Sequence, residues 1–161
     1  MAARLTLDPA RYRDAVQAML GLGAVARRSS LEPALLELVK VRASQINGCG
    51  FCLDMHTKDA RASGETEQRL YLLGAWREAN VYSDRERAAL AWTEAVTKLE
   101  HQDVPDAVYE RARAEFTEEE LVALTLAIVQ INGWNRLSIA FRYTAGDYQP
   151  GSLDRLVSAH G

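Results

Sequence analysis

SQINGCGFCLDMH, residues 44–56, is the stretch that decides the fold and the chemistry expected of this chain. A glycine, Gly48, interrupts an apolar helical run, and Cys49 and Cys52 follow it at once, with His56 four residues further on. The chain of 161 residues contains no other cysteine. The pattern leaves three alternatives: a metal clamp, a structural disulfide, or a redox-active dithiol with its own proton shuttle.

The glycine break predicts that both cysteines lie at the beginning of a helix. Cys49 is expected at or near the N-terminus and Cys52 inside the first turn, where unpaired N–H groups and the positive end of the helix dipole favour a thiolate. The spacing also lets one sulfur attack the other after oxidation. His56 shares a helical face with Cys52, and an imidazole can pass a proton to a leaving oxygen near neutral pH.

A carboxylate on the preceding helix is the candidate partner of the histidine. If the helices before and after Gly48 pair antiparallel, Glu37 lies within roughly 5 Å, one helical turn, of the level of His56. Glu37 is flanked by leucines, and burial among them is expected to raise the pKa of its carboxyl group and to suit it to proton exchange. The sequence therefore predicts a proton relay from Glu37 through His56 to Cys52 and Cys49.

Helical patterns run through the whole chain, and strand patterns are scarce. Pro9 is typical of a first helical position and predicts a helix to about Leu20, followed by a connector over 21–28. The later patterns predict six further helices at 30–47, 49–63, 65–79, 83–100, 105–116 and 117–143, the last with a break near Gly133. Two pairs are spaced as capping boxes, Ser83 with Glu86 and Thr117 with Glu120.

These patterns predict an all-α, single-domain helical bundle of about seven helices that spans 1–161. Its core is expected over about 30–143, and 145–161 is expected to be a loop or a loosely attached arm. One short sequence, Gln-Ile-Asn-Gly, occurs at 45–48 and again at 130–133, each time near the end of an apolar run. The repeat is explained either by two equivalent helix pairs or by chance and helix-end chemistry.

Composition restricts the classes of partner. Hydrophobic residues make up 48% and charged residues 25%, as in a globular protein, and the net charge of −3 with no basic run argues against nucleic acid. The N-terminus lacks the apolar core of a secretory signal, and the apolar stretch at 121–131 is too short to span a membrane. We therefore expect a cytoplasmic protein, in which a permanent structural disulfide is not expected.

A metal or nucleotide site is not favoured. Cys49, Cys52, His56 and Glu37 could supply four zinc ligands. However, the first three are crowded on one short helical segment, and the chain has no second CxxC or HxxxH. No GxGxxG motif indicates a bound NAD(P)H or flavin, so no cofactor is predicted.

Six residues with functional chemistry lie within a stretch of twenty at defined spacings. They are Glu37, Ser44, Asn47, Cys49, Cys52 and His56. This set resembles the motif of the AhpD-like alkylhydroperoxidases, which belong to the carboxymuconolactone decarboxylase superfamily. IVQINGWNRLSIAFR, residues 128–142, resembles the second hallmark of that superfamily, an Asn-Arg-bearing helix beside the dithiol. The resemblance covers roughly 30–143. The best-known members carry a histidine directly before the second cysteine, where this chain has Phe51.

The resemblance implies an all-helical fold that assembles into trimers or hexamers and reduces organic hydroperoxides or hydrogen peroxide. It implies that Cys52 is the peroxidatic cysteine, that Cys49 resolves its sulfenic acid to a disulfide, and that Glu37 and His56 form the relay. An external thiol or dithiol would then reduce the disulfide. Two other functions remain open: a disulfide reductase or redox sensor that uses the same dithiol, and a non-enzymatic, metal-binding helical protein.

Overall fold

Helices make up most of the chain in the computed structural model, which describes residues 2–152. Within these residues there are seven α-helices, two short 3-10 helices and no strand. The elements are α1 (Arg13–Arg28), α2 (Pro33–Asn47), α3 (Gly50–Ala62), α4 (Glu67–Leu72), η1 (Leu73–Ala75), α5 (Asp84–Lys98), η2 (Glu100–Gln102), α6 (Asp106–Glu115) and α7 (Glu118–Phe141). The predicted all-α fold of about seven helices is confirmed.

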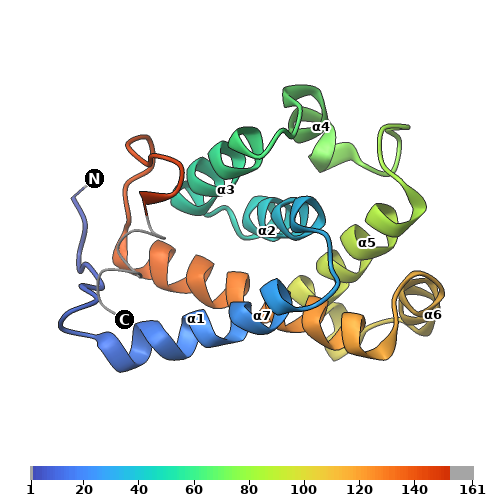
Figure 1. The fold of residues 1–161 in the computed structure, drawn as a ribbon, viewed down its shortest axis with the longest axis horizontal. Coiled ribbons are helices and arrows are strands. Elements are labelled where there is room, and N and C mark those ends of the chain that lie inside the picture. The colour runs from blue at the N-terminus through green and yellow to red at the C-terminus, as the bar shows by residue number, and fades with distance from the viewer. Residues whose placement is uncertain (1, 153–161) are drawn as a thin grey trace.

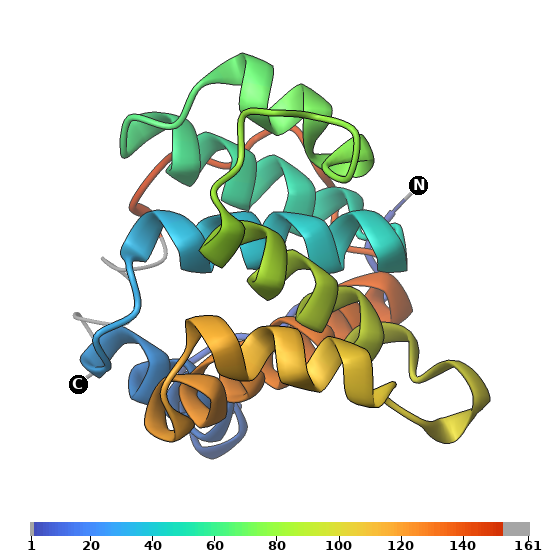
Figure 2. The same cartoon turned by 90° about the vertical axis from the view of Figure 1, so that its right-hand side faces the viewer.

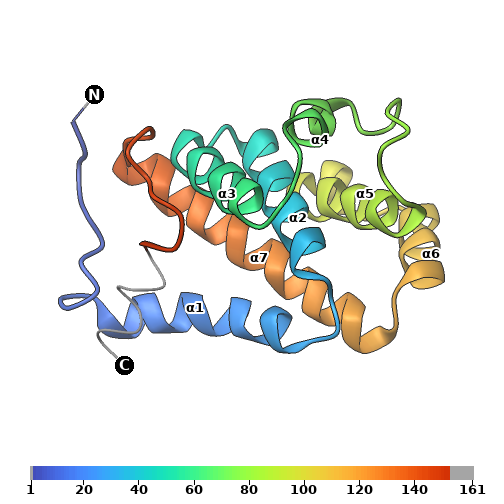
Figure 3. The ribbon, with the colours of Figure 1, turned by 45° about the horizontal axis from the view of Figure 1, so that its top comes forward.

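The helix α2 is central to the arrangement. It packs against α3, α5 and α7, and it lies in the middle of the molecule in Figure 1. The long helix α7 runs beside α1 in the opposite direction, as Figure 3 shows. Seen from the side, α2 and α3 lie above α1, α6 and α7 (Figure 2). The two helices that carry the candidate site residues are therefore adjacent, and α7 supports them from below.

Local sequence signals set several helix ends as predicted. Both capping boxes are present, with Ser83 and Glu86 at the start of α5 and Thr117 and Glu120 at the start of α7. The end of α2 is fixed by Gly48, whose φ of 70° lies in the left-handed region that favours glycine. This turn reverses the chain, so that α3 packs back against α2.

Three predicted boundaries are wrong. The first helix begins at Arg13 rather than Pro9, and it continues through the predicted connector to Arg28. Likewise α7 is unbroken at Gly133. The reason is close packing of α1 on α7, because a β-carbon at Gly23 would collide with the amide of Gln130 and one at Gly133 with Met19. These glycines allow two helices to approach and do not end them.

The predicted helix over 65–79 is also shorter than expected. It consists of α4 followed by the 3-10 turn η1, and the chain after η1 is a turn. In this turn Trp76 is buried and its indole N–H donates a hydrogen bond to the carboxylate of Glu94 at 2.8 Å. The turn after η1 therefore contains an indole that is buried and bonded to α5.

The buried apolar side chains form two large clusters and one small one. The small cluster consists of Ala43, Cys49, Cys52 and Ile131, with Phe51 packed against it. It joins α2, α3 and α7 and places both cysteines in an apolar setting. No helix within residues 2–152 has the length and apolar character needed to cross a membrane.

Candidate functional site

The two cysteines lie where the glycine break predicted. Cys49 is the N-cap of α3, and Cys52 lies in the first turn, where its backbone N–H donates to Cys49 Sγ at 3.3 Å. The sulfurs are joined in a disulfide, with the two Cα atoms 5.4 Å apart. The exposed fractions are only 1% for Cys49 and 2% for Cys52. The structure therefore shows the oxidised pair, buried at a helix N-terminus.

The predicted partners of the dithiol also meet. Glu37 on α2 and His56 on α3 face each other, with 3.0 Å between His56 Nδ1 and Glu37 Oε2. The other carboxylate oxygen, Oε1, accepts from Lys40 Nζ at 2.6 Å. The antiparallel pairing of α2 and α3 about Gly48 thus produces the contact that the register predicted. Lys40 is a partner that the sequence analysis missed, although its position three residues after Glu37 is a signal for such a pair.

The ionisation of Glu37 differs from the expectation. Burial raises the pKa of its carboxyl group, but the hydrogen bond with His56 and the charge of Lys40 outweigh burial and lower the pKa from 4.5 to about 2. The predicted raised pKa is therefore wrong, because the hydrogen bond with His56 and the charge of Lys40 act on the carboxyl group more strongly than the leucines around it. An ionised carboxylate only accepts hydrogen bonds, so Nδ1 of His56 carries the proton and Nε2 is left to exchange one.

The last link of the relay is not formed in this oxidised state. Within residues 2–152, no hydrogen bond joins His56 to either sulfur. The structure therefore shows two separate pairs on one helix hairpin, Glu37 with His56 and Cys49 with Cys52, and the predicted relay between them stays a prediction.

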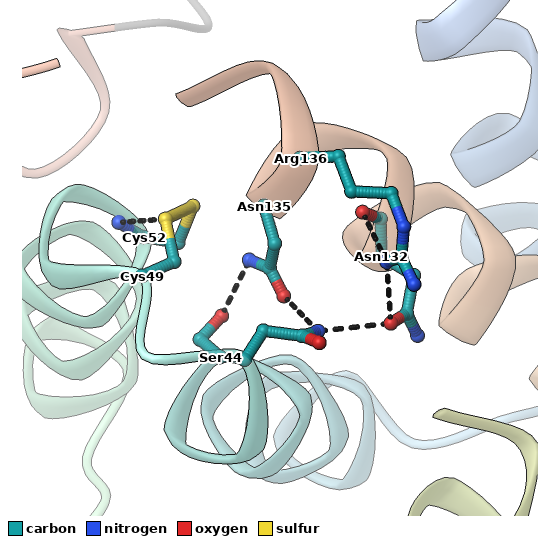
Figure 4. The surroundings of a disulfide bond; sticks show 7 residues. Ser44, Cys49, Cys52, Asn132, Asn135 and Arg136 are labelled. Atoms are coloured by element: carbon teal, nitrogen blue, oxygen red, sulfur yellow. Dashed lines mark hydrogen bonds between the residues drawn. A yellow bond between two sulfur atoms is a disulfide. The ribbon is translucent and has the colours of Figure 1, made fainter. Parts of the chain in front are cut away.

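A polar network lies beside the disulfide, between α2 and α7 (Figure 4). Asn135 is fully buried; its amide donates to Ser44 Oγ at 3.0 Å and accepts from Asn47 Nδ2 at 2.8 Å. The same Nδ2 atom also donates to Asn132 Oδ1 at 2.9 Å. Asn47 and Asn132 occupy the same position in the two Gln-Ile-Asn-Gly repeats, but only the first repeat ends a helix. The network fixes α7 against the α2–α3 turn that bears the dithiol.

One side of the disulfide borders an open cavity of about 280 Å³. The cavity lies between the α2–α3 turn, residues 48–51, and the end of α7, with Ser138, Ile139 and 142–144. Of the two cysteines, Cys49 lines it and Cys52 does not. The rings of Phe51 and Tyr143 form part of its wall and meet edge to face at 5.3 Å between centroids. The C-terminal wall was missed by the sequence analysis, because it arises from a contact between segments about ninety residues apart.

The chain after α7, residues 143–148, crosses α3, and we call this segment the strap. Asp54 on α3 accepts from the Gly146 N–H at 2.8 Å, and Lys58 Nζ donates to two carbonyls of the strap at 3.0 Å each. The predicted loop over 145–161 is thus bound to α3 as far as it is described, and 153–161 lie outside the described residues. The strap covers one flank of the helix that carries the dithiol.

No group of three or more His, Cys, Asp and Glu side chains that could hold a metal ion occurs within residues 2–152. The four zinc ligands considered from the sequence do not converge, because Glu37 and His56 bind each other and the cysteines form the disulfide.

Comparisons with known proteins place this geometry in a family. The model of the carboxymuconolactone decarboxylase family matches residues 13–95. The uncharacterised protein YdfG of Bacillus subtilis is 48% identical over 127 residues, which cover 79% of this chain and 86% of the relative.

Two solved structures share the fold. A protein of unknown function from Agrobacterium tumefaciens, provisionally named as the antioxidant defence protein AhpD, superposes with a TM-score of 0.84 at 41% identity over 91% of this chain and 100% of that one. The debrominase Bmp8 superposes with a TM-score of 0.76 at 17% identity over 86% of this chain and 74% of that one. The likeness to the debrominase shows the fold alone.

Proposed function

This chain belongs to the carboxymuconolactone decarboxylase family, and from that premise we propose that it is an AhpD-like, thiol-dependent peroxidase of organic hydroperoxides or hydrogen peroxide. The observation that carries the proposal is one helix hairpin that holds a bonded cysteine pair and a Glu37–His56 pair. The antioxidant name given to the Agrobacterium relative agrees with this activity. A dithiol that cycles needs a reducing compartment, which supports a cytoplasmic location.

The reaction begins with the reduced protein. The thiolate of Cys52 attacks one peroxide oxygen; a sulfur–oxygen bond forms, the O–O bond breaks, and an alkoxide leaves. His56 supplies the proton that turns the alkoxide into an alcohol. Cys49 then attacks the sulfenic sulfur, the disulfide forms and water leaves, before a further oxidation can occur. Two thiols thus supply the two electrons that reduce one hydroperoxide to one alcohol and one water.

The ionised state of Glu37 gives it a specific role in this reaction. With a pKa of about 2, its carboxylate does not carry a proton near neutral pH. It instead holds the imidazole of His56 in one tautomer through Nδ1. The proton that moves is then carried by His56, and Glu37 acts as the positioning residue.

The decisive experiment is rapid mixing of the reduced protein with cumene hydroperoxide and with hydrogen peroxide, with free thiols counted before and after. We expect loss of two thiols per peroxide consumed. In Cys49→Ser, mass spectrometry after brief exposure should find sulfenic acid on Cys52. If Cys52→Ser reacts as fast as wild type and Cys49→Ser does not react, the two roles are exchanged. Disulfide exchange without peroxide consumption would identify a disulfide reductase or redox sensor instead.

We further propose that the chain forms homo-trimers or homo-hexamers. The apolar helix α7 buries Leu121, Leu124 and Ile128 in its own bundle but leaves Val122 59% and Val129 46% exposed on one face. A face shared between copies would bury them, and closed rings are a common result. Sedimentation equilibrium at micromolar concentration tests the assembly, and a single species at 17.9 kDa would contradict it.

A further inference from the structure

We infer that the cavity beside Cys49 receives the reductant, and that this reductant is a small thiol that carries a carboxylate. The inference rests on the proposed function in one respect, because a catalytic disulfide must be reduced after each turnover. Its evidence is independent of peroxide chemistry and lies in the size of the cavity, its charge and the position of Cys49 in its lining.

The first argument is access. Both cysteines are at least 98% buried, and of the two only Cys49 lines the cavity. A volume of about 280 Å³ lies just below the range of drug-sized ligand sites, roughly 300–1,000 Å³. The strap lies against the same helix start, with Ala145 near Gly50 and Gly146 bonded to Asp54. A thiol that reaches Cys49 through this cavity is therefore small.

The second argument is charge. Within residues 2–152, Arg142 is the only charged residue that lines the cavity, and its guanidinium has no ion pair or hydrogen bond there. Asp54, a carboxylate on α3 that could repel an anion, is paired with Lys58 at 2.8 Å. The aromatic wall of Phe51 and Tyr143 suits a short apolar linker between a thiol and an anion. A carboxylate is the group that a guanidinium binds in two-point fashion.

The third argument is the backbone at Arg142. Its φ of 58° places it in the left-handed region at the end of α7, where glycine is the usual residue. Its N–H donates to the Ile139 carbonyl and the N–H of Tyr143 donates to that of Ser138, so the helix end is closed by backbone groups alone. The side chain of Arg142 takes no part in this closure, and Arg142 is among the residues that line the cavity.

The reduction runs in two balanced exchanges. The thiolate of the small thiol attacks Cys49 Sγ, a mixed disulfide forms, and Cys52 leaves as a thiolate. A second thiolate attacks the sulfur of the bound reductant, which leaves as its own disulfide and releases Cys49 as a thiolate. Two small thiols thereby lose two electrons to the protein disulfide, and no other reactant takes part.

The experiment measures reduction of the oxidised protein by three probes that differ in charge: 3-mercaptopropionate, 2-mercaptoethanol and cysteamine. For each probe the rate in wild type is divided by the rate in Arg142→Gln, so the intrinsic reactivity of the thiol cancels. We expect a ratio of about 5 for the anion, in the range of a partly exposed charge pair, and about 1 for the other two. Arg142→Lys should restore most of the anion rate, and Arg142→Glu should favour cysteamine.

The matched control is Arg136→Gln, which removes an exposed arginine of the same helix that does not line the cavity. It should leave all three ratios near 1, and high salt should remove the anion preference of wild type. Equal ratios for the three probes would overturn the inference, as would faster reduction by a CxxC protein at equal thiol concentration. No peroxide enters this assay, so its outcome does not depend on peroxidase activity. The inference about the reductant and the proposed peroxidase function can therefore fail separately.

Discussion

Two carboxylates, the half-buried Glu37 on α2 and the buried Glu94 on α5, show how similar electrostatics can serve different purposes. Glu94 accepts from Arg42 at 2.9 Å, from the Trp76 indole at 2.8 Å and from Arg77 at 2.6 Å. Burial raises the pKa of Glu94, but these three donors outweigh burial and lower the pKa below its ordinary value, as His56 and Lys40 do for Glu37. Both groups are therefore ionised at neutral pH, and ionisation alone does not distinguish them.

The difference lies in the partners. Glu94 is held by two guanidiniums and an indole, which do not exchange protons near neutral pH. Glu37 is held by an imidazole, and that imidazole lies on the helix of the dithiol. A carboxylate that shares a proton-exchanging partner can support catalysis, whereas one enclosed by fixed donors supports the fold. Four experiments test this distinction.

The largest effect is expected on peroxide reduction. Glu37→Gln should slow the reaction by about 10- to 1000-fold, because the imidazole loses the anion that orients it and with it part of its general acid–base contribution of about 100- to 10,000-fold. Glu94→Gln, measured in the same rapid-mixing assay well below its unfolding temperature, should stay within about threefold of wild type. An unchanged rate in Glu37→Gln would make Glu37 an ordinary helix residue.

The second effect concerns stability, where the variant of Glu94 should lose more than the variant of Glu37. Glu94→Gln should lower the free energy of unfolding by about 3 kcal/mol, because it leaves the guanidinium of Arg42, only 15% exposed, without its anion. Glu37→Gln should cost less, about 2 kcal/mol, since an imidazole can lose its charge and a guanidinium cannot. Urea unfolding of the two variants at neutral pH measures both. Equal losses would mean that the chemistry of the partners does not matter.

The third effect is the pH dependence of stability that Glu37 confers. Its pKa in the fold, about 2, lies below the ordinary value of 4.5. Ionised Glu37 therefore stabilises the fold above about pH 4.5, and this contribution fades as the pH falls toward 2. The stability difference between wild type and Glu37→Gln should shrink by about 1–2 kcal/mol between pH 6 and pH 3.5. A difference that grows on acidification would restore the raised pKa expected from the sequence.

The fold could be predicted wherever one local signal decides. The capping boxes of α5 and α7 and the glycine turn at Gly48 were identified from the residues alone, and all three are present. The prediction failed at α1 and at Gly133, because glycines that lie in a helix contact have the same local sequence signature as glycines that end a helix. Only the packing of α1 on α7 separates the two cases.

In the candidate site, too, the features set by local sequence could be predicted and those set by contacts between distant segments could not. The spacing across Gly48 predicted the meeting of Glu37 and His56, because a helix hairpin fixes the register. The pKa of Glu37 was predicted in the wrong direction, because the hydrogen bond with His56 and the charge of Lys40 together outweigh burial, and the local sequence does not show that balance. The cavity wall at Arg142 and Tyr143 could not be predicted, because nothing local shows that the end of α7 reaches α3.

The smallest effect separates the two guanidiniums around Glu94. Arg77 is 61% exposed, and its guanidinium lies over the Trp76 ring at 4.3 Å from the centroid. Arg77→Gln should cost about 0.5 kcal/mol, as an exposed ion pair with a weak cation–π contact does, and the loss should shrink in 1 M salt. Arg42→Gln should cost more and respond less to salt, because its pair with Glu94 is shielded from solvent. If Arg77→Gln proves as costly as Arg42→Gln, burial is not what makes the Glu94 cluster structural, and the contrast with Glu37 would rest on the proton-exchanging imidazole alone.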